Sequence, residues 1–97
     1  MKYKQWDCEP IIGYYGNGNT GIQLIDKEDK SLVAVATINL IDGLPENQAY
    51  IKDYSENEGM LEALKDVGIV TKVIGNRRSG YITAPLCELD LEKLGGR

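Results

Sequence analysis

The chain contains no histidine, so the side chains that could carry chemistry are its carboxylates, its two cysteines and a few cations. Asp53 and Glu56 are two carboxylates close in sequence, and such a pair could act as acid and base in glycoside hydrolysis. Nucleophiles activated by histidine are excluded, whereas a Ser/Lys pair or a lone cysteine stays open. Because no feature of the sequence signals a deep substrate pocket, we expect a protein that is not an enzyme.

The two cysteines, Cys8 and Cys87, lie near opposite ends of the chain, and neither belongs to a CxxC pair. Without histidine or paired cysteines the usual metal-ligand spacings are absent, so we expect neither a metal site nor another cofactor. In a reducing compartment such cysteines are mostly buried small hydrophobic residues. We therefore expect free, buried thiols and no disulfide.

The segment from Asp42 to Asp66 has seven acidic residues and two lysines, a net charge of −5 in a chain whose total is −4. In a helix that begins at Ser55, the dipole favours acidic residues of the first turn. It does not favour Glu62 and Asp66, which also repel each other at i, i+4 spacing. Such a face is typical of a solvated helix or of a surface that docks on Lys/Arg-rich protein. The candidate partner-binding residues are Asp53, Tyr54, Glu56, Glu58, Glu62 and Asp66.

Positive charge collects at Lys72, Arg77 and Arg78, in and around the loop expected between the last two strands. Neighbouring arginines can fork onto a carboxylate or a phosphate, so these three residues form an alternative anion-binding set. The glycine-rich stretch 13–21 looks like a phosphate-binding loop, but it lacks the Walker lysine and a following helix. Its Asn17-Gly18 pair favours a tight hairpin turn instead.

Local signals predict one helix, over residues 55–67. Ser55 and Glu58 have capping-box spacing at its start, and Gly68 supplies a left-handed stop at its end. An apolar stripe at helical spacing is formed by Met60, Leu61, Leu64 and Val67. The helix is therefore expected to pack on a sheet through this stripe, with its acidic side outward.

Runs rich in β-branched and aromatic residues predict strands at 11–15, 21–26, 31–41, 48–53, 69–74 and 81–89. The longest run, 31–41, is almost continuously apolar and is expected at the centre of the sheet. The prediction is an α+β fold of order β-β-β-β-α-β-β, a mainly antiparallel sheet of five to six strands with one α-helix on one face. Residues 1–10 form an N-terminal edge segment that Pro10 ends, residues 75–80 a polar loop, and residues 90–97 a tail expected to fray.

Length and composition fit a single domain, residues 1–97, with a pI near 4.7. This acidic balance argues against a general binder of the phosphate backbone, so no direct nucleic-acid binding is expected. Since the sequence has neither a membrane-length apolar run nor a signal peptide, we expect a cytoplasmic protein that does not bind membranes. Exposed sheet edges leave a homodimer open.

Three blocks of sequence carry a family resemblance. They are Leu44-Pro45-Glu46-Asn47-Gln48-Ala49-Tyr50-Ile51, the adjoining stretch to Leu61, and the ending with Gly75, Ser79-Gly80-Tyr81 and Pro85-Leu86-Cys87. Over about Tyr15 to Leu89 the chain resembles a family of small proteins of unknown function from bacteriophages, plasmids and integrative elements of Gram-positive bacteria. The resemblance implies a genomic setting in which small acidic proteins often inhibit host defence.

From the resemblance and the acidic segment we expect a non-enzymatic phage or mobile-element protein that inhibits a host defence system. Its partner would be a bacterial defence protein with a Lys/Arg-rich surface, a CRISPR effector or another nuclease, and anti-CRISPR activity is the most concrete version. One alternative is a sponge that captures a nucleotide immune signal through Arg77 and Arg78. Others are a hydrolase acting on a nucleotide or sugar, and an accessory protein of the element's own replication or transfer.

Overall fold

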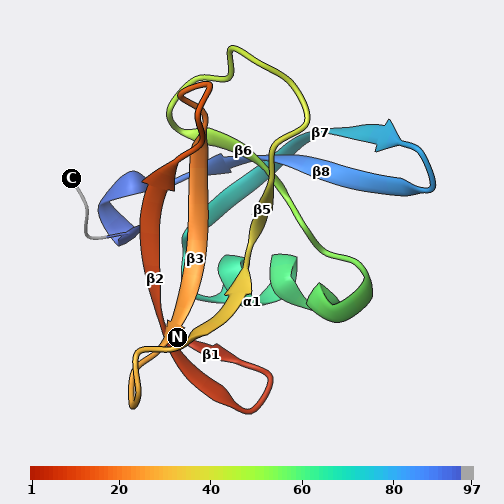
Figure 1. Ribbon diagram of the computed structural model, residues 1–97. Coiled ribbons are helices and arrows are strands. Elements are labelled where there is room, and N and C mark those ends of the chain that lie inside the picture. The colour runs from red at the N-terminus through yellow and green to blue at the C-terminus, as the bar shows by residue number, and fades with distance from the viewer. Residues whose placement is uncertain (95–97) are drawn as a thin grey trace.

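The computed structural model describes residues 1–94, which form two four-stranded antiparallel sheets and one α-helix (Figure 1). The first sheet has the order β1 (Lys2–Tyr3), β2 (Trp6–Tyr14), β3 (Thr20–Asp26), β4 (Leu32–Val35). The second has the order β5 (Thr37–Ile38), β6 (Gln48–Ile51), β8 (Ile82–Leu89), β7 (Val70–Ser79). The 3-10 turn η1 (Ser55–Asn57) and the helix α1 (Met60–Asp66) connect β6 to β7, and the 3-10 turn η2 (Leu91–Leu94) follows β8. The predicted α+β class, antiparallel strands and one helix are confirmed, although the strands are more numerous and lie in two sheets.

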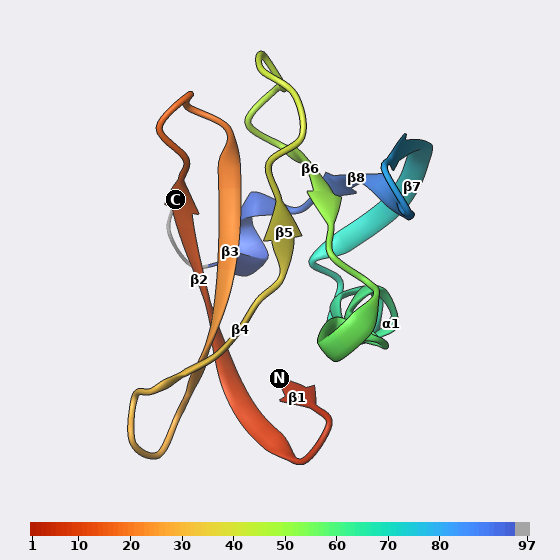
Figure 2. The same cartoon turned by 45° about the vertical axis from the view of Figure 1, so that its right-hand side comes forward.

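The two sheets are joined by the apolar run that was predicted to be one central strand. Its first part, β4, pairs with β3, and its second part, β5, pairs with β6. The buried Ala36 lies between them: its N–H donates to the carbonyl of Ile22 at 2.8 Å, and its carbonyl accepts from the N–H of Lys52 at 2.8 Å. Figure 2 shows β4 and β5 following one another between β3 and β6. Only Ala36 and Thr37 of this run are buried, at the point where it crosses from one sheet to the other, and Leu32 at its start is exposed.

The core lies between the sheets and α1. Along β3 every second side chain is buried, as the pleat of a strand with one covered face requires, and Ile22 and Leu24 are fully enclosed. Ile51 of β6 and Met60 and Leu64 of α1 are buried in the same cluster. Burial of each such side chain is worth about 1.5–3 kcal/mol, so α1 is held mainly by its two inward residues.

The helix begins later than predicted. Gly59 precedes α1 in a left-handed conformation with φ 92°, and Ser55, with φ 55°, instead begins η1. The predicted capping box is therefore wrong: within the described chain neither Ser55 nor Glu58 caps a turn through its side chain. Asp53 takes that role, because its Oδ1 accepts a hydrogen bond from the N–H of Leu61 at 2.9 Å.

The end of the helix is as predicted. Gly68 has φ 81°, and its N–H donates to the carbonyl of Lys65 at 3.0 Å. The N–H of Ile69 donates to the carbonyl of Leu64 at 3.0 Å, so two terminal carbonyls are satisfied by the residues that follow the helix.

The prediction that Pro10 ends the N-terminal segment is wrong. Pro10 lies inside β2, opposite Leu24. The N–H of Cys8 points away from β3 and donates to the carbonyl of Met1 at 2.7 Å. Two residues further on, the nitrogen of Pro10 faces the same outer edge, beyond the part of β2 that pairs with β1. The strand therefore continues through the proline without losing a ladder hydrogen bond.

Two predictions near the C-terminal end are also wrong. Residues 75–80 are not a loop, because β7 continues to Ser79 and only Gly80 and Tyr81 form the turn. Residues 91–94 do not fray but form η2, with the side chain of Leu94 buried in the core. The rest of that predicted tail, residues 95–97, lies outside the described residues.

Candidate interaction surfaces

The backbone of η1 is fixed against the first sheet by three hydrogen bonds. Lys4 Nζ and the Tyr3 hydroxyl donate to the carbonyl of Glu56 at 2.7 and 3.3 Å. The side chain of Asn57 is buried, and its Nδ2 donates to the carbonyl of Val35 at 2.7 Å. The backbone of η1 is therefore held in place before any partner binds. Less conformational entropy is lost when its side chains contact a partner.

Three of the six predicted partner-binding residues are engaged within the protein. Asp53 is half-buried and caps the start of α1, and Tyr54 is half-buried with Lys52 Nζ 5.9 Å from its ring centroid. Glu56 is exposed but forms an ion pair with Lys52 at 2.8 Å. That hydrogen-bonded contact lowers the pKa of Glu56 and raises the pKa of Lys52. Asp53 and Glu56 therefore each have a partner of their own, and no contact joins their carboxylates among the described residues.

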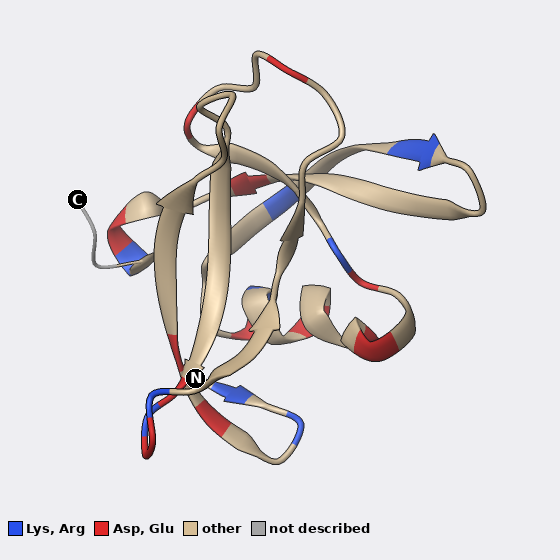
Figure 3. Cartoon of the chain, viewed as in Figure 1, with Lys and Arg blue, Asp and Glu red and all other residues tan. Residues whose placement is uncertain are grey.

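The other three, Glu58, Glu62 and Asp66, are exposed, and we call them the outer acidic row. Within residues 1–94 none of them has an ion-pair partner. Figure 3 shows the acidic positions following one another along η1 and α1. Because α1 begins at Met60, Glu62 lies in its first turn, where the helix dipole favours a carboxylate. The prediction that helix physics disfavours both Glu62 and Asp66 therefore applies only to Asp66, the last residue of α1.

The acidic residues of the first sheet are arranged differently. Asp7 lies 3.8 Å from Lys27 Nζ, and Glu9 lies 3.9 Å from Lys30 Nζ. These exposed pairs add little stability, but they neutralise the field around that sheet. Other acidic residues of this region, Glu28 and Asp29, have no recorded ion pair, so what distinguishes the outer acidic row is its place along one fixed turn and helix.

The predicted anion-binding residues lie in one strand but do not converge. Lys72, Arg77 and Arg78 are all exposed on β7, with Lys72 opposite Glu88 near the base of the hairpin. Arg77 is opposite Ala84 and Arg78 is opposite Thr83. Consecutive residues of a strand face opposite sides, so the two guanidinium groups leave β7 in different directions.

Tyr81 is a candidate contact residue that the sequence reasoning missed. It lies in the two-residue turn between β7 and β8, and its side chain is fully exposed. Tyr54, the tyrosine among the predicted partner-binding residues, is half-buried by comparison. The signal that could have identified Tyr81 is its position directly after Gly80, between two runs able to pair as a hairpin.

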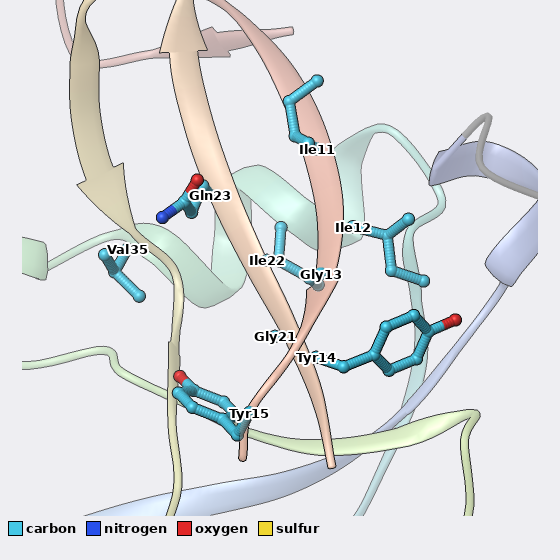
Figure 4. A pocket seen from close by; sticks show the side chains of 9 residues that line it. All are labelled: Ile11, Ile12, Gly13, Tyr14, Tyr15, Gly21, Ile22, Gln23 and Val35. Carbon is cyan, nitrogen blue, oxygen red and sulfur yellow. The ribbon is translucent and has the colours of Figure 1, made fainter. Parts of the chain in front are cut away.

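A shallow groove of about 260 Å³ lies on the first sheet (Figure 4). Its floor is the cross-strand pair Gly13 and Gly21, which leaves the backbone uncovered between the side chains around it. The ring of Tyr15 crosses Gly21, and its hydroxyl shares a hydrogen bond with Thr37 Oγ1 at 2.8 Å. The lining holds no charged residue, so the groove offers apolar contact without a group that would orient a charged ligand.

Both cysteines are free and buried, as predicted. Burial raises the pKa of Cys8, and it raises the pKa of Cys87 to about 11. At neutral pH both groups are therefore protonated thiols, which are poor nucleophiles.

Comparison of the chain with protein-family models, with curated proteins and with solved structures finds no match. The family resemblance drawn from the sequence therefore stays a prediction. No helix among residues 1–94 is long and apolar enough to cross a membrane. What the protein does has to be inferred from its two charged surfaces, the outer acidic row and the cations of β7.

Proposed function

We propose that the protein is a non-enzymatic inhibitor that docks its outer acidic row on a Lys/Arg-rich surface of a bacterial nuclease effector. The observation that carries the proposal is the outer acidic row itself. Glu58, Glu62 and Asp66 follow one another within nine residues, all are exposed, and none has an ion-pair partner within the described residues. Carboxylates exposed in this way on a fixed support are available to a cationic partner.

Nuclease effectors are suitable partners on electrostatic grounds. A protein that holds nucleic acid needs a channel lined with Lys and Arg, because the phosphate backbone dominates its affinity. A row of carboxylates presents negative charge to such a channel, raises the rate of encounter and sets the register of docking. Asp66 supports this interpretation, since an aspartate at the last residue of α1 opposes the helix dipole and has no recorded ion-pair partner, although Lys65 lies in the same turn.

Capture of a single nucleotide is less well supported by the geometry. The guanidinium groups of Arg77 and Arg78 leave opposite faces of β7, so they do not form a fork around one phosphate. We therefore retain the acidic row as the functional surface of this proposal.

The proposal is tested by adding the full chain to DNA cleavage reactions run by purified RNA-guided effectors of Gram-positive bacteria. Glu62→Lys with Asp66→Lys should weaken inhibition about tenfold or more, because the field that steers association is reversed. Folding should change little: Glu62→Lys loses favourable dipole interaction, whereas Asp66→Lys gains it at the other end of α1.

The matched control is Glu28→Lys with Glu92→Lys, which changes the net charge equally at exposed positions outside η1 and α1. It should inhibit nearly as well as the unmodified chain. Equal weakening by both variants would assign the effect to total charge, and a chain that slows no effector would overturn the proposal.

A further inference from the structure

The hairpin of β7 and β8 extends beyond the sheet that carries it. β6 pairs with β8 only from Gln48 opposite Glu88 to Tyr50 opposite Leu86. Past that point, residues 76–79 and 82–85 pair with each other alone, and we call residues 75–85 the β7–β8 arm. Figures 1 and 2 show its tip at the periphery of the molecule, away from the first sheet. Pro85 fits where β8 leaves β6, since its nitrogen is on the side that β6 no longer covers.

The arm has the opposite charge to the body. From residue 71 to residue 87 the chain contains Lys72, Arg77 and Arg78 and no acidic residue. The side-chain hydrogen bonds recorded in the described arm are local: Arg78 Nε donates to the carbonyl of Gly80 at 3.3 Å, and at the base Cys87 Sγ donates to the carbonyl of Pro85 at 3.8 Å. The net charge of the whole chain is −4, which is unfavourable for binding phosphate. In the fold, however, the acidic residues lie in the body of the protein, whereas the arm carries cations alone.

We propose that the β7–β8 arm binds a nucleic acid by lying in a groove, with Arg77 and Arg78 reaching phosphates on its two sides. Tyr81 at the tip stacks on a base or inserts between bases. A two-stranded ribbon fits the major groove of duplex DNA, which is about 12 Å wide. Exposed aromatic side chains on such arms gain energy by stacking on bases or wedging between them.

The divergence of the two arginines is what favours a groove. A single phosphate, or a flat acidic surface, offers anions on one side of the ribbon and would leave one guanidinium unpaired. The two walls of a nucleic-acid groove offer phosphates on both sides. Asn76, next to Arg77 in β7, and Thr83, opposite Arg78 in β8, are exposed beside these cations and could donate to phosphate oxygens or base edges.

The test measures fluorescence anisotropy of a short labelled DNA duplex, and of one of its single strands, with the full chain at a series of low salt concentrations. Binding should be saturable and should weaken as salt rises. Arg77→Glu with Arg78→Glu should lower the affinity about tenfold or more and reduce the salt slope by about two, one for each phosphate that is no longer neutralised. Arg77→Gln with Arg78→Gln removes the same two cations without adding negative charge and should give the same change in slope.

Lys27→Glu with Lys30→Glu is the matched control, because it makes the same change in net charge at the β3–β4 turn. At the highest salt of the series it should change the affinity by less than about threefold, since exposed charges outside the arm are screened most there. Tyr81→Ala should weaken binding without altering the salt slope, because stacking releases no counterions.

Three results would overturn the inference: no saturable binding by the unmodified chain, equal loss in the lysine control, or competition by polyglutamate as strong as by unlabelled DNA. The last would assign the arm to acidic protein surfaces. The inference does not depend on the proposed inhibition. Glu62→Lys with Asp66→Lys leaves the arm intact, so it should retain DNA binding even where it no longer inhibits an effector.

Discussion

The two longest hairpins of the molecule are built from similar sequence signals but end differently. The β2–β3 hairpin closes over Asn17-Gly18, and its tip is tied to the loop between β5 and β6. Asn17 Nδ2 donates to Asp42 Oδ1 at 2.6 Å, and Asn19 Nδ2 donates to Asn39 Oδ1 at 3.0 Å. Asn19 Oδ1 in turn accepts from the N–H of Leu44 at 3.1 Å. This tip is part of the fold.

The β7–β8 hairpin closes over Gly80 and Tyr81, and no other segment of the described chain is recorded in a hydrogen bond with its tip. From Gly75 to the turn its pairing is regular, as that of β2 and β3 is, and its two register shifts lie nearer the base, between Val70 and Gly75. The difference between the two tips therefore comes from a distant loop, which meets one tip and not the other. Side chains that the fold does not use, such as Arg77 and Tyr81, are the ones available for a partner.

The largest effect is expected where the β2–β3 tip is tied down. Asn19 is almost fully buried and joins three groups of the β5–β6 loop, so Asn19→Ala removes three partly buried hydrogen bonds. We expect the free energy of unfolding to fall by about 2–3 kcal/mol. Urea denaturation followed by the fluorescence of the single tryptophan, Trp6, measures it.

Asn76→Ala is the matched change in the arm, where Asn76 is exposed. It should alter the free energy of unfolding by less than about 0.5 kcal/mol. If the two alanine variants were equally stable, the amide contacts of the β2–β3 tip would not be what distinguishes the hairpins.

A smaller effect is expected from glycines within the strands. An added Cβ on Gly21 would lie 3.1 Å from Cε2 of Tyr15, so the ring has to shift and strain its hydrogen bond with Thr37. Gly21→Ala should destabilise the protein by about 1–2 kcal/mol, as measured by the same denaturation.

Gly75→Ala tests the arm in the same way, because an added Cβ there meets no atom within 4 Å. It should leave stability unchanged or raise it by about 0.5 kcal/mol, since alanine loses less backbone entropy than glycine on folding. A destabilisation as large as that of Gly21→Ala would mean that the arm is as tightly packed as the first sheet.

The fold class could be predicted because it depends on local signals that the chain carries in full. The apolar stripe of Met60 and Leu64 and the stop at Gly68 define the helix, and β-branched runs define most strands. The start of the helix was wrong because Ser55 and Glu58 have the right spacing for a capping box, while Gly59 adopts the left-handed conformation that prevents it. Residues 31–41 form two strands because the backbone of Ala36 forms hydrogen bonds with both sheets. These are contacts between segments distant in sequence, so the spacing of apolar residues does not predict them.

The candidate surfaces were predictable to the extent that they depend on charge. The sequence shows both the acidic segment and the cations, but it does not show that the helix begins only at Met60. In this shorter helix the dipole favours Glu62 in the first turn and disfavours Asp66 at the end. It placed Arg77 and Arg78 in a loop, whereas their position in β7 sends them to opposite faces. Tyr81 was overlooked because exposure at a tip depends on which distant loops reach it.

The smallest effect on stability is expected at the tip of the β7–β8 hairpin. Each hairpin has a tyrosine near its turn, Tyr15 in one and Tyr81 in the other, so the two can be compared directly. Tyr15 gives its hydroxyl to a hydrogen bond with Thr37, so Tyr15→Phe should cost about 1 kcal/mol of unfolding free energy. Tyr81 is fully exposed, and Tyr81→Ala, although it removes the whole ring, should change that energy by less than about 0.5 kcal/mol. A larger loss at Tyr81 would mean that the ring packs on the body in solution, and the arm would then be a structural hairpin like the other. A negligible loss, together with weaker DNA binding, would separate the role of this tyrosine from folding.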